Sequence, residues 1–496
     1  MHIFDLPLEL LDLILHHSIV VRGLPRALRL KLVCKSFQAA VGRILFHTKV
    51  LDDVKWGHAF RSWNERRHHG ADTLWHDYLV FRCRDKTDSS VPCYVEIRSV
   101  VDALVQWQNT NNRQEKTQDW DEVLDKLCWL ALECPMIGGN TWQGWNGVRK
   151  DGPRNLGLST LSAATYLGYA PLVRDLLAQP GAPEPTQDDD LFPSPMYIAA
   201  RTGQADMLQL LQEHLPQFEQ FDPYIPSAWR SKLGPGSLTG AASRGDMDMV
   251  RLCLYPPSRI INPENGDDDT TILGHSPRSL PGSTHLSVYM LWATWRARSP
   301  EVYRYLQSLL SPFGYMSSMH LATMAGVGDI PMVRFLIEEV GADPSDTRTA
   351  GGTPLAHAVR ACNDDVVDLL LQKYHADPNE RGAYRLGTTL TAAARAGSMV
   401  MLRKLLDGGY RPVIDQPKGG DNHTLRCAVK LEHTAMVELL LDLGVGSEGG
   451  RVRAMKLADG MGLESMVELL SSRAPDDEGC AGIADVMTLY GDLSLI

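Results

Sequence analysis

The chain has 496 residues, and its 49 Lys and Arg against 60 Asp and Glu give a formal net charge of −11. Its 44% hydrophobic and 22% charged residues are typical of a folded chain and exclude a disordered one. Net negative charge without long runs of one sign disfavours direct binding to a nucleic-acid backbone. We therefore expect a monomer whose partners are other proteins.

The sequence also disfavours a membrane or secreted location. No segment reaches the roughly 20 continuous apolar residues that a membrane-spanning helix needs. Asp5, Glu9 and Asp12 stand where a secretory signal has its basic and apolar regions. The nine cysteines are scattered without a framework spacing, which is typical of a reducing compartment. We expect an intracellular protein of the cytoplasm or nucleus.

Residues 1–47 are predicted to form a helical module. Within it, residues 4–46 form a compact helical hairpin with one apolar side that the hairpin itself does not bury. Asp5 before Pro7 marks a helix start, because proline is favoured in a first turn. Two apolar stripes follow at helical spacing, the first made of Leu10, Leu13 and Ile14 and the second of Leu30, Val33 and Phe37.

This stretch resembles an F-box, through its Leu6-Pro7-x-Glu9 start, its Ile14-Leu15 pair and its Val33-Cys34-Lys35-Ser36-Phe37 end. In that family these positions dock onto the Skp-type linker subunit of a cullin–RING ubiquitin ligase. The interval from Ile14 to Val33 is longer than usual, and a structural cap on the downstream domain is the alternative. The resemblance implies a partner-binding surface made of Leu6, Pro7, Glu9, Leu10, Ile14, Leu15, Val33 and Phe37.

Residues 48–157 predict a helical connecting region that folds against the first repeats. A helical stripe runs through Val123, Leu124, Leu127, Leu130 and Ala131. The region is rich in tryptophan, and its last part contains Trp142 and Trp145. We favour packing onto the array for this aromatic pair over a ligand-binding platform.

From about residue 158 the sequence repeats one phrase, in which small residues lead into a turn position and a leucine-rich segment follows. Nine turn positions align, at separations of 30 to 52 residues: Gly168, Gly203, Gly245, Ala297, Gly328, Cys362, Gly397, Glu432 and Gly462. Four residues before the turn, eight units have alanine, at 164, 199, 241, 293, 358, 393, 428 and 458; Met324 is the exception. Such a period indicates a solenoid of stacked units.

The residue types in the phrase predict a pair of helices in each unit. Alanine lets neighbouring helices approach closely, and glycine adopts the left-handed conformation that ends a helix. The second helix is often opened by a capping residue, as at Asp246, Asp329 and Ser398. Cys362 and Glu432 replace the turn glycine, through adaptation for binding or through drift.

The units resemble ankyrin repeats over about 158–475. Thr353-Pro354-Leu355 is similar to the family's opening, and Gly341-Ala342-Asp343-Pro344 to its approach to the hairpin tip. The resemblance implies an all-α ankyrin-repeat solenoid of about nine helix-turn-helix units, followed by a C-terminal tail at 476–496. Three Pro-, Gly- and Asp-rich insertions, near 180–195, 213–236 and 255–284, predict exposed, mobile loops. Their Asp triplets lack the ligand spacing of a calcium loop, so we favour solvated turns.

The sequence contains no constellation that predicts catalysis. We find no phosphate-binding loop, dinucleotide fingerprint, nucleophile elbow, H-E-x-x-H or C-x-x-C pair. Cys83 and Cys93 have no histidine at ligand spacing, and the adjacent pairs His16-His17 and His68-His69 cannot converge on one ion from a regular helix. We expect no enzyme activity, no cofactor and no metal.

Two functions from different classes follow. In the first, an F-box-type receptor docks to a ubiquitin ligase while the repeats hold a target. In the second, the layout, which is similar to that of filamentous-fungal ankyrin-repeat proteins, serves a transcription coregulator that binds a regulatory protein, for example for a secondary-metabolite gene cluster. A structural organiser is a third possibility. Ankyrin resemblance places partner binding at the repeat tips, here Arg348, Asn379, Arg381, Tyr384, Arg385 and Lys418.

Overall fold

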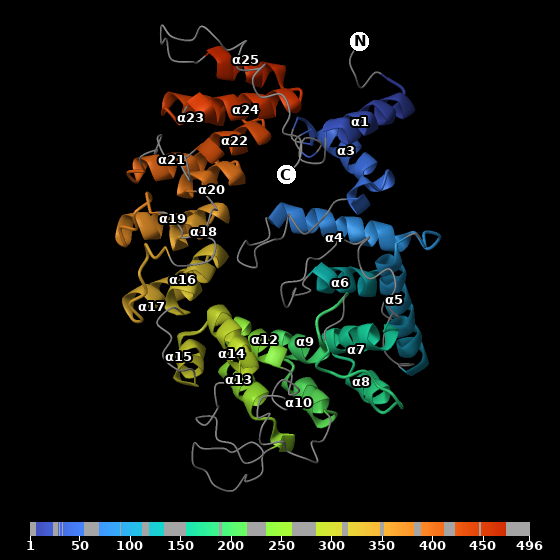
Figure 1. Cartoon of the computed structure of the whole chain (residues 1–496). Helices are drawn as coiled ribbons and strands as arrows, with labels where there is room; N and C mark the ends of the chain where they lie inside the picture. The colour runs from blue at the N-terminus through green and yellow to red at the C-terminus, as the bar shows by residue number, and fades with distance from the viewer. Residues whose placement is uncertain are drawn as a thin grey trace. The chain divides into compact units, whose positions relative to one another are not determined.

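A computed structural model of the chain contains 23 α-helices and no strand in the part that it describes. The described residues are 6–22, 28, 30–31, 33–53, 69–89, 91–111, 119–132, 155–187, 191–215, 235–259, 284–309, 316–347, 352–380, 388–410, 422–445 and 448–472. Contacts divide the chain into unit 1 (Met1–Ala376) and unit 2 (Asp377–Ile496), and each is described by itself. Figure 1 labels the helices of both units.

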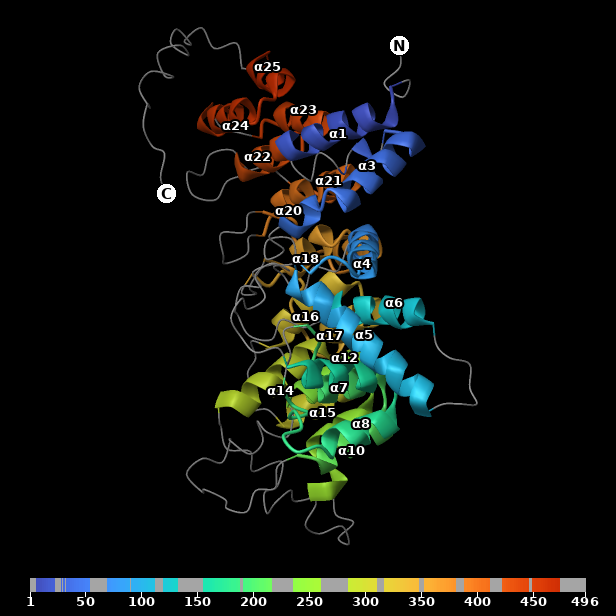
Figure 2. The ribbon, with the colours of Figure 1, turned by 90° about the vertical axis from the view of Figure 1, so that its right-hand side faces the viewer.

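Unit 1 begins with the expected helical hairpin. Helix α1 (Leu8–Arg22) packs against α3 (Lys35–His47), as Figure 2 also shows. The short 3-10 turn η2 (Val50–Asp53) leads into three longer helices of the connecting region. These are α4 (His69–Arg84), α5 (Pro92–Asn111) and α6 (Trp120–Leu132). The predicted stripe of α6 is buried, and both α5 and α6 contact the first repeat helix, so the connecting region folds against the array as expected.

Nine helix pairs follow in chain order. In unit 1 they are α7 (Leu156–Leu167) with α8 (Ala170–Leu177), α9 (Pro195–Thr202) with α10 (Ala205–Glu213), α12 (Pro235–Arg244) with α13 (Met247–Leu254), α14 (Thr284–Arg296) with α15 (Pro300–Leu309), α16 (Met316–Val327) with α17 (Ile330–Glu338), and α18 (Pro354–Arg360) with α19 (Asp364–Asp368), which the π-helical turn η6 (Leu369–Lys373) continues. The 3-10 turn η4 (Pro257–Arg259) follows the third pair.

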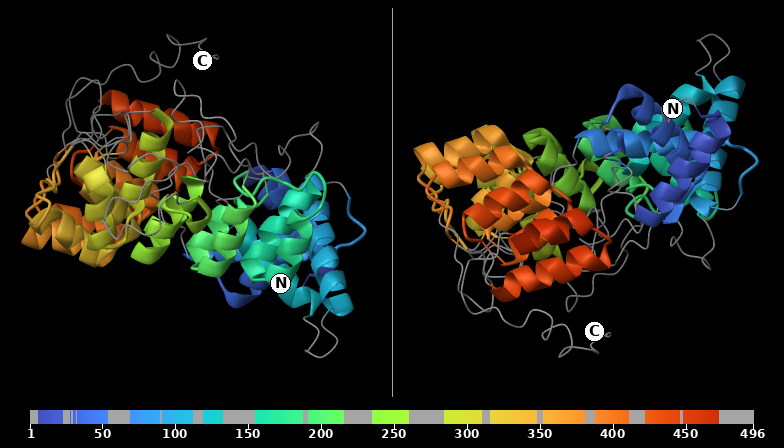
Figure 3. Two further views of the ribbon diagram at one scale, coloured as in Figure 1. Left: turned by 90° about the horizontal axis from the view of Figure 1, so that it is seen from below. Right: turned by 90° about the horizontal axis from the view of Figure 1, so that it is seen from above.

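Unit 2 holds the last three pairs. They are α20 (Thr389–Ala396) with α21 (Met399–Asp407), α22 (Asn422–Lys430) with α23 (Thr434–Asp442), and α24 (Glu448–Gly460) with α25 (Glu464–Ser472). In each unit the first helix of one pair packs on the first helix of the next, for example α12 on α9 and α22 on α24. The orange-to-red helices of unit 2 lie side by side in the view from above (Figure 3).

The nine aligned turn positions each separate the two helices of one pair. All the glycines among them have a positive φ, between 66° and 81°. Cys362 and Glu432 adopt the same left-handed conformation, with φ of 54° and 53°. Eight of the nine turn positions are therefore left-handed, and Ala297 is the exception. The conformation is not confined to glycine, because Cys362 and Glu432 adopt it at the cost of contact between Cβ and the backbone.

The residue four places before the turn, an alanine in all pairs but one, is buried in every pair. All eight of these alanines have no exposed surface, and Met324 in the same place is 1% exposed. In eight of the nine pairs the carbonyl of this residue accepts a hydrogen bond from the N–H just after the turn, as from Ser398 to Ala393 at 3.2 Å. This bond satisfies a carbonyl that the helix end would otherwise leave unpaired.

The predicted caps of the second helices are confirmed. The side chains of Asp246, Asp329 and Ser398 accept hydrogen bonds from the N–H three residues on, at 3.0, 3.3 and 3.2 Å. Thr353 caps the first helix α18 in the same way, at 3.2 Å. Each cap satisfies an N–H that has no partner inside its helix.

The first insertion differs from the expectation of an exposed loop. Leu191 and Phe192 are 5% and 0% exposed, and the carbonyl of Pro193 accepts a hydrogen bond from Ser162 at 3.0 Å. The prediction was wrong at 191–194. It relied on the flanking Pro and Asp residues and neglected the apolar Leu191-Phe192 pair, whose burial stabilises the fold. Most of the other two insertions, at 216–234 and 260–283, lies outside the described residues, as do the tail at 476–496 and the tryptophan pair.

Candidate partner-binding surface

Helix α1 has apolar side chains on two opposite sides. Leu11, Leu15 and Ile19 follow one another at intervals of four residues and are 5%, 3% and 1% exposed. They pack toward α3, whose own buried residues are Ala40, Val41, Ile44 and Leu45. A surface helix usually buries one such stripe and places polar residues opposite it. The opposite side of α1 departs from that rule.

The second side of α1 is apolar and exposed. Leu10, Leu13, Ile14 and Val21 recur at helical spacing and are 48%, 51%, 46% and 82% exposed. The residues at 8–33 supply seven of the nine large apolar side chains that are exposed in the described part of the chain. Several exposed apolar side chains on one side of a helix are unusual on a soluble protein, and larger exposed apolar patches mark interaction sites. We call these seven residues the α1 face: Leu8, Leu10, Leu13, Ile14, Val20, Val21 and Val33.

An ion pair holds the two helices of the hairpin in register beside this face. The guanidinium of Arg43 in α3 donates a hydrogen bond to Asp12 in α1 at 2.6 Å. That hydrogen bond raises the pKa of Arg43 above its ordinary value. Both side chains remain about one third exposed, so the pair orients the helices more than it stabilises them.

The structure places most of the predicted docking residues at the surface. Pro7, Glu9, Leu10, Ile14 and Val33 are exposed, and Leu6 and Phe37 are partly exposed. Leu15 is the exception, because it lies in the core of the hairpin at 3% exposure. The predicted docking set omits Leu8, Leu13, Val20 and Val21, although Leu13 was assigned to the first apolar stripe. A count of both helical stripes of α1 would have found them, since the helix has more apolar residues than one buried stripe can hold.

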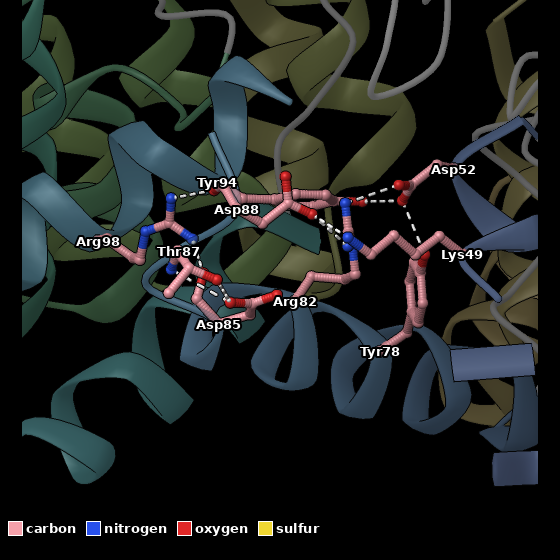
Figure 4. Close-up of polar contacts among 9 residues, drawn as sticks. All are labelled: Lys49, Asp52, Tyr78, Arg82, Asp85, Thr87, Asp88, Tyr94 and Arg98. Atoms are coloured by element: carbon pink, nitrogen blue, oxygen red, sulfur yellow. Dashed lines mark hydrogen bonds and ion pairs between the residues drawn. The ribbon is translucent and has the colours of Figure 1, made fainter. Parts of the chain in front are cut away.

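A buried polar network joins the hairpin to the connecting region, and Figure 4 shows its side chains. Arg82 of α4 is 1% exposed. It forms ion pairs with Asp52 of η2 at 2.7 Å and with Asp88 at 2.8 Å. Burial alone would lower the pKa of Arg82, but Asp52 and the other groups around it outweigh that effect and raise it.

Further contacts complete this network. The hydroxyls of Tyr78 and Tyr94 each donate a hydrogen bond to Asp52 at 2.7 Å, and the guanidinium of Arg82 lies 4.8 Å from the centre of the Tyr94 ring. Lys49, which follows α3, pairs with Asp88. The segment that follows α3 is therefore fixed to α4 and α5 by charge-assisted hydrogen bonds, in which Lys49 supplies a cation and Asp52 an anion. The α1 face is carried on a hairpin that is anchored to the connecting helices.

The structure describes one of the predicted repeat-tip residues. Asn379 is partly exposed, and its side-chain amide donates hydrogen bonds to Asp377 at 3.0 Å and to the carbonyl of Gly409 at 3.3 Å. Asn379 thus links its own tip to the end of α21 in the following repeat. The other predicted residues lie outside the described residues: Arg348, Arg381, Tyr384, Arg385 and Lys418.

The residues considered for chemistry occupy structural positions. Cys83, Cys93 and His357 are buried, and burial raises the pKa of the Cys93 thiol well above its ordinary value. A thiol with a raised pKa stays protonated and is a poor nucleophile. No group of three or more His, Cys, Asp or Glu in the described ranges could hold a metal ion. Among the helices that the structure describes, none is long and apolar enough to cross a membrane.

A comparison with protein families identifies part of the array. A family model described as ankyrin repeats, in three copies, matches residues 293–382, which run from α14 to the tip after η6. Proteins with such repeats are typically non-catalytic and bind other proteins. A comparison with curated proteins returned no match. Residues 293–382, which are helical and strand-free in the part that the structure describes, are therefore ankyrin repeats.

Proposed function

We propose that the protein is a non-enzymatic scaffold in which the α1 face docks onto one partner while the ankyrin array holds a second. The observation that carries the proposal is the exposed apolar α1 face, because a helix with two apolar sides has one side to offer to another protein. The F-box resemblance of the same residues makes the Skp-type linker subunit of a cullin–RING ligase the first partner.

The proposal extends the ankyrin array beyond the residues that the family model matches. The helix pairs before and after 293–382 have the same buried alanine and the same turn position. These shared features support ankyrin repeats in all nine pairs from 156 to 472, six in unit 1 and three in unit 2. Stacked repeats of this kind present a surface on which a target protein can lie.

The exposure of its apolar side chains supports a docking role for the hairpin over a role as a structural cap. A cap would bury its second apolar side against the connecting region, whereas Ile14 and Val33 are 46% and 62% exposed. Fully burying an exposed side chain of this size contributes roughly 1.5–3 kcal/mol, so a half-exposed one such as Ile14 would contribute about half of that on a partner. The ion pairs of Arg82 with Asp52 and Asp88 would hold the hairpin against the connecting helices while a partner is bound.

The test measures binding of the purified linker subunit to the full-length chain. Leu10→Asp with Ile14→Asp places two charges on the α1 face without touching the hairpin core. We expect the intact chain to bind and the double variant to lose about two orders of magnitude in affinity. Val400→Asp is the matched control, because Val400 is an apolar residue of comparable exposure, 57%, on a repeat helix, α21.

Circular dichroism of each variant shows whether the helices remain folded. If the intact chain does not bind the linker subunit, the ligase proposal fails and the hairpin is a cap. The coregulator function would then be the better interpretation. If Leu10→Asp with Ile14→Asp binds as tightly as Val400→Asp, the partner uses another surface.

A further inference from the structure

Charge is unevenly distributed over the helices of the repeats in unit 2, where α21 and α24 hold both signs and the other four hold one sign each. The second helices α23 and α25 have two acidic residues each and no Lys or Arg. The first helices α20 and α22 have Arg395, Arg426 and Lys430 and no Asp or Glu. Such segregation is unexpected in a chain whose net charge is −11, because an acidic surface would otherwise cover both sides.

The basic residues of neighbouring repeats stand at equivalent places. Arg395 and Lys430 each follow the buried alanine of their helix by two residues. Arg426 and Lys456 each precede it by two residues, and α24 packs on α22 as α22 packs on α20. Since the buried alanines of stacked helices lie at one level, equivalent positions lie side by side. The cations therefore form two pairs between neighbouring first helices, Arg395 with Lys430 and Arg426 with Lys456.

Side-chain contacts bring part of this set together. The guanidinium of Arg395 lies 2.9 Å from Nε2 of His423, which is one turn from Arg426 on α22. Burial lowers the pKa of His423, and Arg395, Arg426 and Lys430 lower it further, with no carboxylate among the groups that act on it. The Nε atom of Arg426 is buried without a hydrogen-bond partner among the described residues. Among the described residues, this part of unit 2 therefore brings three cations close to one imidazole.

We propose that the first-helix side of unit 2, around Arg395, Arg426 and Lys430, binds an Asp- and Glu-rich segment of a partner protein. Arg395 and Lys430 are exposed and Arg426 is partly exposed, so carboxylates can reach them. Nucleic acid is a poorer fit, because proteins that bind it commonly neutralise about 6–10 phosphates and this chain is acidic overall. The inference deepens the proposed function, since it gives the chemistry of the protein that the array holds.

The experiment uses the full-length chain and a fluorescein-labelled peptide of alternating Glu and Asp, with fluorescence anisotropy as the readout. We expect binding that weakens as NaCl rises from about 50 to about 300 mM, because salt screens exposed charges. Arg426→Glu with Lys430→Glu should weaken it by about tenfold or more. Arg403→Glu is the matched control, since Arg403 is exposed on the second helix α21.

Each remaining outcome overturns the inference. A lack of peptide binding by the intact chain would refute it, as would equal losses in the Arg426/Lys430 and Arg403 variants. Preferential binding of a single-stranded oligonucleotide of equal charge would assign the surface to nucleic acid. The linker subunit is absent from this assay and the acidic peptide from the earlier one, so a failure here is distinct from a failure of the proposed docking.

Discussion

Replacing Arg82 with methionine is expected to destabilise unit 1 by about 3 kcal/mol. The substitution keeps most of the side-chain volume but removes the cation between Asp52 and Asp88, whose side chains are 11% and 9% exposed. Loss of one partner from a buried ion pair costs about 3–5 kcal/mol, because the remaining charge stays desolvated. We expect the lower end of that range, since Lys49 still neutralises Asp88 and two tyrosine hydroxyls still bind Asp52.

Arg84→Met provides a matched control on the same helix. Arg84 pairs with Asp121 at 2.8 Å, but the two side chains are 59% and 50% exposed, and exposed pairs contribute at most about 1 kcal/mol. Urea unfolding followed by tryptophan fluorescence measures both variants, since Trp75 is buried in α4. Adding Asp52→Asn to Arg82→Met should recover part of the loss. Equal destabilisation by Arg82→Met and Arg84→Met would refute the role assigned to the network.

Three further substitutions test the repeat itself. Cys362→Gly should stabilise the chain by about 0.5–1 kcal/mol in urea unfolding, because φ at this position is 54°, whereas glycine at Ala361, where φ is −83°, should destabilise it. Gly240→Ala should destabilise by about 1–3 kcal/mol despite its better helix propensity, since a Cβ there would lie 2.9 Å from the carbonyl oxygen of Tyr197; no change in the urea midpoint would contradict that contact. His320 is buried, which lowers its pKa from 6.5 to about 4. As pH falls from 6.5 to 4, the unfolded chain takes up a proton before the folded chain does, so the free energy of unfolding should fall by up to about 3 kcal/mol. His320→Gln should reduce this pH dependence, which thermal unfolding across the same range would measure.

The sequence predicted the array well because its signals are local and repeated. Each unit needs a left-handed residue where its first helix ends and a small residue where that helix meets its neighbour. Glycine and alanine therefore recur at these two places in most units. The positions of the nine turns and of the buried alanines follow from that pattern. Even Cys362 and Glu432, where glycine is missing, could be placed by their distance from the alanine.

The candidate surface was only partly predictable. The exposed face of α1 follows from helical spacing, but the burial of Leu15 depends on which way the helix is rotated against α3. The network around Arg82 could not be predicted, because its members at 49, 52, 78, 82, 88 and 94 share no period and meet through tertiary packing. Charge segregation in unit 2 needs both the helix boundaries and the stacking register, and neither is a property of one short motif.

The division into two units has a spectroscopic consequence. All eleven tryptophans lie at or before residue 295, so unit 2 contains none. Intrinsic tryptophan emission therefore follows unit 1 alone, while far-ultraviolet circular dichroism sums over the helices of both. A single unlabelled sample, titrated with denaturant and read by both signals, would resolve the unfolding of each unit without dissecting the chain.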